Sequence, residues 1–527
     1  MYPIRQQQTG ISNLTNFVFS DYQIIRLKNP PHSTYYYREL SQKKNASHTL
    51  SYLDEETAKL ILKPYLEEHL GGFSANQLNQ CADTLLLSVK EEREMKDLYN
   101  LIEISPTLYW DNQYQTLRKN TELVESEVSF FKLFDSRFYT EHRPEVNPIL
   151  IQAVEVMPRY YDYQNRIEEI ASSTEPGQSL DFSPLLPEEL NFMNAWTKDN
   201  PDVLSDILRM IATVFMKRKP LGSFCLIGKA RGGKSACVNM LHTMLGSRNT
   251  SLVKMSQLAD DHYTHQLLHS LLNAPDEEDD TTLDRQQANF KVLADHGTLT
   301  LSRMGSNEPL YLTADFTSIF PMNHMPEWKG SGTEACMRRT LAIPFLADLS
   351  SQDNRSMHFE RDTYTAKMYA HLIPLVLAIA SFYSREGQKM IFSPTMQGYQ
   401  RFMEEETSSA SVYFKLFERY FNGFTTVSFL YTDYVNWCKI NEYRMQTRKE
   451  FQFFFSGYLL SKPTTRVVQV AGRKTLSVRC YVGQKPYPIM HPDMRLENMK
   501  QPLGAYHEIG GSVMERMQKM QEERNEW

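Results

Sequence analysis

Several features that are common in other protein classes are missing from this sequence of 527 residues. The six cysteines are scattered and form no C-x-x-C pair, so their spacing suggests neither a zinc site nor a disulfide framework. The longest apolar run, about Ala370 to Tyr383, contains His371 and Pro374 and is shorter than the ~20 residues of a membrane helix. The Gln-rich segment Met1 to Gly10 lacks the apolar stretch of a signal peptide. These absences favour a protein of the reducing cytoplasm with no membrane partner.

An excess of positive charge is missing as well. Lys and Arg number 57 against 63 Asp and Glu, which gives a formal net charge of −6. This balance argues against a protein that coats DNA through a globally basic surface. It leaves room for local DNA contacts, because a pore or a single helix needs only a few Lys or Arg side chains. The length allows roughly three to four domains of ~150 residues.

The chain divides into five parts by its residue pattern. Residues 1–100 mix Tyr-rich and charged segments without an interpretable motif, and residues 101–186 are mixed and end in a polar, linker-like stretch, Ser172 to Ser183. From 187 to 400, strand and helix signals alternate, as in a three-layer α/β domain. Residues 411–484 have the order of a winged helix-turn-helix, and residues 485–527 form a charged tail. The expected elements of that fourth part are helices at Ser411 to Phe421, Phe429 to Asn441 and Thr447 to Leu460, and strands at Thr465 to Val470 and Thr475 to Val482.

A glycine-rich motif lies in the α/β part. Gly228 to Ser235 matches G-x-x-x-x-G-K-[ST], after an apolar strand pattern at 222–228 and before a helix pattern at 234–245. The backbone N–H groups of such a loop, together with the helix N-terminus, bind phosphate. Lys234 is expected to reach the β- and γ-phosphates, and the Ser235 hydroxyl is expected to bind Mg²⁺. ATP and Mg²⁺ are therefore the expected cofactors; an ordinary Gly-rich turn is the alternative. The predicted nucleotide-binding residues are Gly228, Gly232, Gly233, Lys234, Ser235 and Ala236.

Carboxylates follow a second apolar stretch, at 271–274. We expect Asp276 to hold Mg²⁺ and Glu277 to activate water, with Glu278 as an alternate for either role. Asn273 and Pro275 interrupt the strand pattern, so a solvated acidic loop from 276 to 280 remains the alternative interpretation.

Two later features suit a ring-shaped ATPase. The strand pattern at 317–322 ends at Asn323, whose amide can orient an attacking water. Arg338 and Arg339 precede another strand pattern, at 341–345, and an arginine presented across a subunit interface can stabilise transition-state charge. Alone, Asn323 is more often a strand-end cap and the arginine pair a solvated face. Their order after the glycine-rich motif favours the functional interpretation.

In this order, the motifs resemble the superfamily 3 helicase module of the poxvirus and phage/plasmid primase–helicase family. The resemblance covers about residues 187–350 and extends more weakly to about 480; the layout is also similar to replication helicases of staphylococcal pathogenicity islands and chromosome cassettes. It implies an α/β P-loop, AAA+-like ATPase core with a C-terminal winged helix. It also implies a hexamer that encircles DNA and unwinds it during replication of a mobile element or phage. By resemblance, Lys234 and Ser235 are Walker A, Asp276 and Glu277 are Walker B, Asn323 is sensor 1, and Arg339, with Arg338 behind it, is the arginine finger.

Two regions are expected to contact DNA. The segment Thr298 to Leu312 has the alternation and the Gly-Ser-Asn turn of a β-hairpin. The resemblance aligns it with a DNA-gripping hairpin and places Arg303 toward the pore; a surface charge is the alternative. In the winged helix, a basic cluster heads the third helix, which enters the major groove in helix-turn-helix proteins. The alternative there is a protein-binding winged helix with solvated charges. The predicted DNA contacts are Lys291, Arg303, Arg448, Lys449, Arg473 and Lys474.

Two other functions stay open at this point. One is an origin-binding initiator that uses ATP as an assembly switch, and the other is a P-loop enzyme that transfers phosphate to a small molecule. Strand displacement separates the helicase from the initiator, and the arginine pair favours a ring over the small-molecule enzyme. No zinc-finger or primase carboxylate motif precedes the α/β part, so primer synthesis is not assigned to this chain, and a separate primase is a candidate partner.

Overall fold

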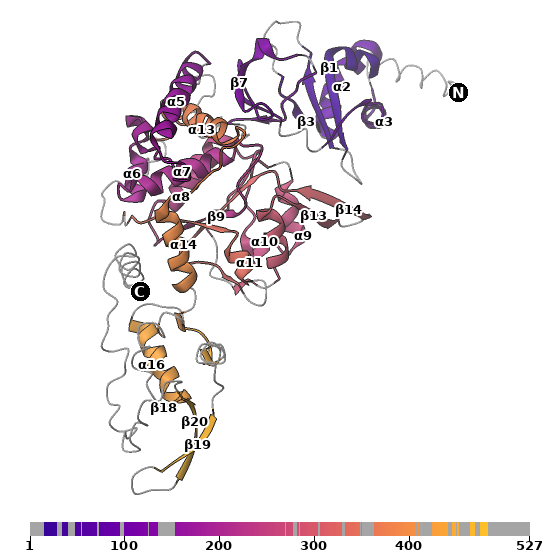
Figure 1. Cartoon of the computed structure of the whole chain (residues 1–527). Helices are drawn as coiled ribbons and strands as arrows, with labels where there is room; N and C mark the ends of the chain where they lie inside the picture. The colour runs from indigo at the N-terminus through magenta and orange to yellow at the C-terminus, as the bar shows by residue number, and fades with distance from the viewer. Residues whose placement is uncertain are drawn as a thin grey trace. The chain divides into compact units, whose positions relative to one another are not determined.

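The structure of the protein is a computed structural model, which divides into two units, Met1–Met396 and Gln397–Trp527. Figure 1 colours the elements along the chain. The described residues run from 15 to 482, with gaps at 29–33, 41–47, 54, 71–72, 95–99, 125, 135–152, 269, 278–281, 284, 304–305, 329–332, 348, 350–362, 407–408, 411–412, 414–423, 441–444, 449–450, 453–463 and 470–474.

The first unit begins with a small sheet and two helices that share a core. The strand order is β3-β2-β1-β4, antiparallel except for the β1–β4 pair. Ser74 and Gln77 form a capping box at the start of the second helix, which satisfies backbone donors there. Apolar side chains of the two helices, such as Leu62 and Leu85, are buried together with Ile24 of the sheet. The elements are β1 (Tyr22–Lys28), β2 (Thr34–Glu39), β3 (Ser51–Leu53), α2 (Glu55–Leu70), α3 (Ala75–Leu87) and β4 (Glu91–Glu94).

A second small sheet follows, in the order β7-β6-β5-β8. Trp110 on β6 is fully buried, and its Nε1 donates a hydrogen bond of 2.8 Å to the carbonyl oxygen of Phe215. This bond joins the sheet to the large core that the rest of the unit shares. The strands are β5 (Leu101–Ser105), β6 (Leu108–Asp111), β7 (Thr116–Lys119) and β8 (Phe131–Lys132).

The central element of the first unit is a five-stranded parallel sheet in the order β10-β11-β15-β9-β17. Every residue of β9 and β15 is buried, as expected for parallel strands that are covered on both faces. The mixed α/β class expected for this part is therefore confirmed. The strands are β9 (Ser223–Ile227), β10 (Thr250–Ser251), β11 (Leu272–Asn273), β15 (Thr317–Met322) and β17 (Thr340–Pro344).

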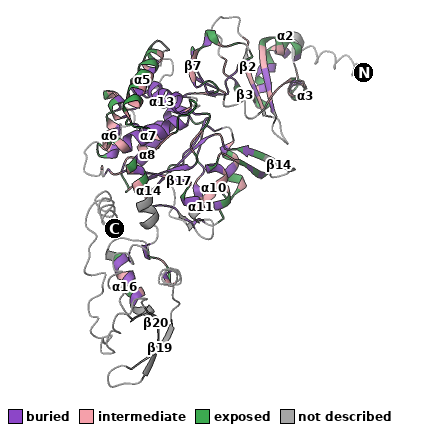
Figure 2. Cartoon of the chain, viewed as in Figure 1, coloured by how far each residue is buried: buried purple, intermediate pink, exposed green. Residues whose placement is uncertain are grey.

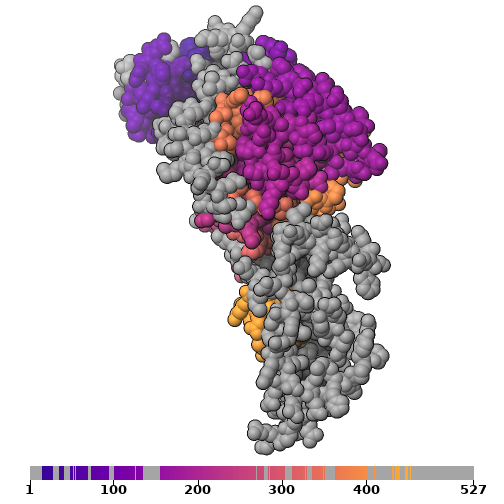
Figure 3. Space-filling model, turned by 90° about the vertical axis from the view of Figure 1, so that its left-hand side faces the viewer, coloured from indigo at the N-terminus to yellow at the C-terminus, as the bar shows by residue number. Residues whose placement is uncertain are grey.

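Helices surround this sheet, and Figure 2 shows that burial is greatest among α7, α8 and α13. The apolar helix α13 packs against α5 and α7, and the space-filling view shows orange residues of its region beside the magenta surface of the α5–α7 region (Figure 3). Among the described residues, α13 alone is long and apolar enough to cross a membrane, yet 83% of that stretch is buried in the protein, as in a core helix. The helices are α5 (Ala153–Ser173), α6 (Phe192–Thr197), α7 (Pro201–Thr213), α8 (Lys234–Leu245), α10 (Gln287–Ala294), α11 (Thr333–Met337) and α13 (Ala366–Tyr383). A further helix, α14 (Pro394–Glu406), begins in the first unit and continues into the second.

A β-hairpin lies between α10 and β15, as the sequence predicts. It consists of β13 (Thr298–Arg303) and β14 (Ser306–Thr313), paired antiparallel with an irregularity between Leu301 and Arg303. Asp261, the first residue of the short helix α9 (Asp261–Thr264), accepts hydrogen bonds from the backbone N–H and the hydroxyl of Ser302. The hairpin is therefore held near its outer end as well as at its root.

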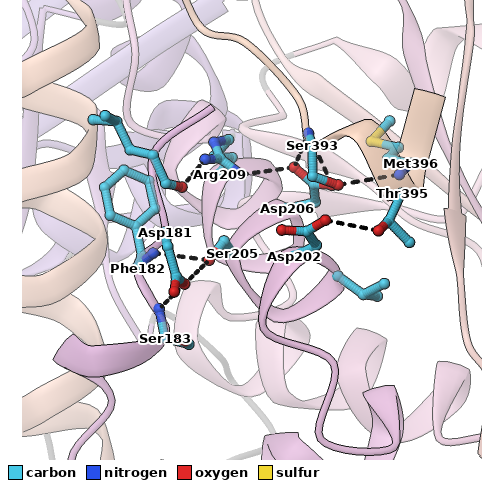
Figure 4. A network of polar contacts seen from close by, with 12 residues as sticks. Asp181, Phe182, Ser183, Asp202, Ser205, Asp206, Arg209, Ser393, Thr395 and Met396 are labelled. Carbon is cyan, nitrogen blue, oxygen red and sulfur yellow. Dashed lines mark hydrogen bonds and ion pairs between the residues drawn. The ribbon is translucent and has the colours of Figure 1, made fainter. Parts of the chain in front are cut away.

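The polar stretch at 172–183 is mostly exposed, but Leu180 and Phe182 near its end pack against the core. Arg209 on α7 donates to the carbonyl oxygen of Leu180 and lies over the ring of Phe182, and all three residues are buried. Arg209 also pairs with Asp206, with 2.7 Å between Nη1 and Oδ1 and both side chains fully buried. Asp206 in turn accepts hydrogen bonds from the backbone N–H and the hydroxyl of Ser393, directly before α14 (Figure 4). One buried charge network thus joins three segments that are distant in the sequence.

The second unit has a three-stranded sheet in the order β18-β20-β19, and helix α16 contacts β18 and β20. Tyr413, Tyr434, Trp437 and Phe451 are fully buried and pack edge to face or at an angle to one another. The predicted helix 429–441 and both predicted strands are confirmed within two residues. The predicted helices 411–421 and 447–460 lie largely outside the described residues, and the tail 485–527 lies entirely outside them. The elements are β18 (Phe424–Thr426), α16 (Val427–Ile440), β19 (Thr464–Gln469) and β20 (Thr475–Val482).

Candidate functional site

The glycine-rich segment, which we call the phosphate loop (228–233), connects β9 to α8 as the sequence predicts. Two of its glycines, Gly228 and Gly233, cannot be replaced freely by residues with a side chain. A Cβ atom at Gly228 would lie 2.1 Å from the carbonyl oxygen of Phe345, and Gly233 has φ +95°, where side chains are strained. The two glycines therefore allow the backbone to pass close to the end of β17 and then turn into the helix.

The loop lies after β9, the strand at which the order of strand addition across the sheet reverses. From β9 the chain passes through α8 to the far strand β10, returns through β11 and β15, and then adds β17 on the other side of β9. In open α/β sheets, ligands bind at the carboxyl ends of the strands at such a reversal. The same edge receives the phosphate loop after β9, residues 274–277 after β11 and Asn323 after β15. The topology thus gathers three of the predicted site segments.

Lys234 lies over this loop rather than in solvent. It is 5% exposed, and its ammonium donates to the carbonyl oxygens of Gly228 (2.5 Å) and Lys229 (2.8 Å) and to Oδ1 of Asn323 (3.0 Å). An ammonium has three N–H donors, so these contacts use all of them. Burial lowers the pKa of Lys234, and the nearby carboxylate of Glu277 opposes this shift. The cation is thus held at the loop by three acceptors of its own chain.

Asn323 links Lys234 to Glu277. While its Oδ1 accepts from Lys234, its Nδ2 donates to Oε1 of Glu277 over 3.0 Å. The orientation of the amide follows from these two partners, because a cation donates and a carboxylate accepts. The structure therefore joins three residues that the sequence predicts as catalytic, each from the end of a different strand.

Ser235 and Asp276 offer exposed oxygen atoms at the same edge. A hydroxyl and a carboxylate are the hard donors that Mg²⁺ prefers, and this pair leaves further positions for water and phosphate oxygens, so the residues fit that ion. No group of three or more His, Cys, Asp and Glu side chains that could hold a metal occurs within the described residues. Glu278, the alternate carboxylate, lies outside the residues that the structure describes.

The strand before the carboxylates is short for a physical reason. Asn273 is fully buried, and its amide pairs with the backbone of Val253: Oδ1 accepts from the N–H at 2.9 Å and Nδ2 donates to the carbonyl at 2.9 Å. A further bond of 3.0 Å comes from the hydroxyl of Ser251. The side chain that interrupts the apolar pattern thus ties β11 to β10 and is structural.

Trp196 is a site residue that the sequence did not indicate. It is 1% exposed, and a Cβ atom at Gly233 would lie only 2.4 Å from its Cδ1. Its ring also packs near Phe345, with 6.1 Å between centroids. The sequence shows only an aromatic residue on a helix, because the contact with the phosphate loop is long-range.

The two candidate finger residues are in different environments. Arg338 is exposed, whereas Arg339 is held by the carboxylate of Asp295, which closely follows α10. Arg339 also donates to the carbonyl oxygen of Ala335 over 2.9 Å. No contact between described residues joins either arginine to Lys234 of the same chain.

The predicted DNA-contact residues are only partly described. Lys291 on α10 is half-buried, and Arg303 pairs with Ser306 at the outer end of the hairpin, where the tip 304–305 and the Arg303 side chain lie outside the description. In the second unit, Arg448 is exposed on a helical residue. Lys449, Arg473 and Lys474 lie outside the described residues, so their role stays a prediction.

Comparisons with known proteins add little to this geometry. No family model and no curated protein sequence matches the chain. Among solved structures, the A form apo structure of the NrS-1 C-terminal region is similar with a TM-score of 0.40 and 11% identity, over 89% of this chain and 98% of that chain. The apo structure of NrS-1 residues 305–718 is similar with a TM-score of 0.38 and 12% identity, over the same shares of the two chains. Similarity at this level establishes neither family nor activity.

Proposed function

We propose that the protein is an ATP-driven DNA helicase that serves replication of a mobile element or phage and works as a hexameric ring on DNA. The observation that carries the proposal is the connected set Lys234, Asn323 and Glu277 at the carboxyl edge of the parallel sheet. A buried cation at a glycine-rich loop, an amide and a carboxylate form the set of groups that phosphoanhydride hydrolysis requires. A cytoplasmic location fits this function.

Each residue of the set has a distinct task in the proposed reaction. Lys234 transfers its N–H donors from the two loop carbonyls to phosphate oxygens, and the exposed Ser235 and Asp276 hold Mg²⁺. The ion, when bound, neutralises charge on the phosphates. Glu277 accepts a proton from the attacking water, and Asn323 holds that water and the carboxylate in register. Because Asn323 contacts both Lys234 and Glu277, phosphate binding and base orientation are coupled.

The arrangement of strands supports an AAA+-like core and a winged helix. In the core, the strand that precedes the phosphate loop lies between β15 and β17 in an all-parallel sheet. In the second unit, β18 is followed by helix α16 and then by the two-stranded ribbon β19–β20. The three strands form the sheet β18-β20-β19. The order of these elements is that of a winged helix, in which a helix reads the major groove and the ribbon contacts phosphate.

The two proposed DNA-contact regions have separable tasks. Arg303 at the hairpin contacts backbone on every sequence, so Arg303→Ala should reduce unwinding of any fork and the salt dependence of binding. Arg448 and Lys449 belong to the recognition helix that the sequence predicts, so replacing both with Ala should lower preference for the element's origin by roughly 1–3 kcal/mol per lost base contact. Unwinding of a scrambled fork should survive in the double variant. If that variant loses generic unwinding as completely as origin preference, the division of tasks is wrong.

Strand displacement tests the proposal. The purified full chain should separate a forked duplex with ATP and fail with ADP, and native mass measurement with nucleotide should show six copies. ATP-dependent assembly at an origin without strand displacement would support an initiator instead. A monomer or dimer whose ATP turnover ignores DNA would contradict both functions and favour phosphate transfer to a small molecule.

A further inference from the structure

The connection between α7 and β9 carries two cations that no described side chain neutralises. Lys217 and Arg218 are exposed, and their side chains form no hydrogen bond or ion pair with the residues that the structure describes. Arginine and lysine at the end of a helix often serve to satisfy its last carbonyl groups. In this connection, however, another residue already has that task.

Lys219 satisfies the end of α7. Its ammonium donates to the carbonyl oxygens of Thr213 (2.7 Å), Val214 (3.4 Å) and Met216 (2.7 Å). Burial lowers the pKa of Lys219 to about 7, against the opposing carboxylate of Asp315, so this residue is a weak source of positive charge at neutral pH. Lys217 and Arg218 are therefore not needed to satisfy the carbonyl groups at the end of α7.

The same connection is fixed to the root of the hairpin by His296. One ring nitrogen of His296 lies 3.0 Å from the carbonyl oxygen of Pro220, and the other lies 2.9 Å from that of Ala314, which directly follows β14. A backbone bond of 2.8 Å from Gly222 to the carbonyl oxygen of Ala294 adds a second link. The backbone at Pro220, two residues after Arg218, is thus held at the root of the hairpin.

One face of that hairpin offers hydroxyl groups and an aromatic ring. Along β13 and β14, exposed side chains alternate with the buried Leu299, Leu301 and Leu312. Hydroxyl side chains contact phosphate oxygens, and exposed aromatic rings stack on the bases of single strands. Tyr311 is 51% exposed, so its ring is available for such stacking. The exposed set is Thr298, Thr300, Tyr311 and Thr313, since the hydroxyl of Ser302 already donates to Asp261.

We propose that Lys217 and Arg218 form a phosphate-contacting site for single-stranded DNA, held in register with the β13–β14 hairpin by His296. The inference rests on the proposed function, because it assumes that DNA runs along the hairpin. It adds a DNA contact in the connection between α7 and β9, which precedes the phosphate loop in the sequence and carries no DNA-binding motif. With this site, a single DNA strand contacts both the hairpin and the connection at its root.

The test compares two double variants of the full chain. Lys217→Ala with Arg218→Ala removes the proposed contacts, and Lys63→Ala with Lys389→Ala removes two exposed lysines elsewhere, with the same change in net charge. Binding of a fluorescein-labelled oligo(dT) is measured by anisotropy over a series of salt concentrations. Each phosphate contact to a single strand adds about 0.7 to the slope of log K against log salt, so the first variant should lose about 1.4 and the control should keep the parent slope.

The outcomes separate this inference from the proposed function. An unchanged slope in the Lys217/Arg218 variant, or an equal loss in the control, overturns the inference and leaves the helicase proposal standing. A parent protein that binds oligo(dT) without salt dependence contradicts the helicase proposal itself. ATP turnover without DNA is measured in the same preparations and should equal the parent rate, because neither residue lies at the phosphate loop. A fall in that rate would mean that the substitutions damage the fold, and Lys217→Gln with Arg218→Gln then repeats the comparison with longer side chains.

Discussion

The carboxylate of Asp295 holds Arg339 through two hydrogen bonds, from Nε to Oδ1 at 2.7 Å and from Nη2 to Oδ2 at 2.8 Å. The contact fixes the guanidinium of Arg339 against its own subunit, while Arg338 remains exposed beside it. Both partners are partly exposed, so the pair contributes about 0–1 kcal/mol to stability. Because Arg338 is the more exposed of the two and Arg339 is already held by Asp295, we propose Arg338, rather than Arg339, as the finger.

The first prediction follows from that contact. Arg338→Ala should lower ATP turnover by on the order of 10³-fold while ATP binding is retained, because a finger stabilises only transition-state charge. Arg339→Ala should have a smaller effect, through the position of Arg338. Steady-state turnover and nucleotide affinity of both variants provide the comparison.

A mixing experiment shows whether the arginine acts between subunits. Arg338→Ala mixed with Lys234→Ala should regain part of the turnover, because some interfaces then combine an intact Lys234 with an intact Arg338. If Arg339→Ala is the more damaging variant, the finger is Arg339, as the resemblance implied. If mixed rings form but recover nothing, neither arginine acts in trans.

The second prediction concerns the close approach of Gly233 and Trp196. Gly233→Ala places a Cβ atom 2.4 Å from the indole and also forces a side chain to φ +95°. Gly387→Ala is a matched control, because it has φ +83° and nothing within 4 Å of the added atom. We expect the control to cost about 1–2 kcal/mol of stability and to bind nucleotide normally. Gly233→Ala should cost more and should weaken nucleotide binding at least about tenfold. Equal affinities in the two variants would show that Trp196 does not shape the loop.

The third prediction concerns the buried network around Asp206. Ser393→Ala removes the hydroxyl that donates to Asp206 over 2.5 Å and accepts from the backbone N–H of Met396 over 3.1 Å. A lost cap and a weakened buried carboxylate together should cost about 1–3 kcal/mol in the free energy of unfolding. The exposed Ser173→Ala should change it by about 0.5 kcal/mol or less. Denaturant unfolding of both variants measures the difference, and equal midpoints would contradict the role of the network.

Local elements of the site could be predicted from the sequence, because their signals are local. The helix predicted at 234–245 matches α8, and the strand pattern at 222–228 contains β9. The hairpin follows from alternation and a Gly-containing turn. The strand before Asp276 was harder to predict, because the buried Asn273 breaks the apolar pattern and pairs with the backbone of Val253.

Long-range relationships could not be predicted in the same way. The strand order β10-β11-β15-β9-β17 follows from packing of the whole chain, and the contact of Gly233 with Trp196 depends on where α6 folds back. The salt bridge between Asp295 and Arg339 is of the same kind, since neither residue has a local signal for the other. The core contact near the end of the stretch 172–183 is also long-range, since Arg209 donates to the carbonyl oxygen of Leu180.

The role of Lys234 is decided by the ATP turnover of Lys234→Ala, measured beside the parent protein and the exposed-lysine control Lys389→Ala. Lys234 is held at the loop by the carbonyls of Gly228 and Lys229, and the account assigns its donors to phosphate oxygens. Loss of two charge-assisted hydrogen bonds should lower turnover by on the order of 10²-fold or more, in a variant that still folds, whereas the control keeps the parent rate. A folded Lys234→Ala protein that hydrolyses ATP at the parent rate would contradict the account.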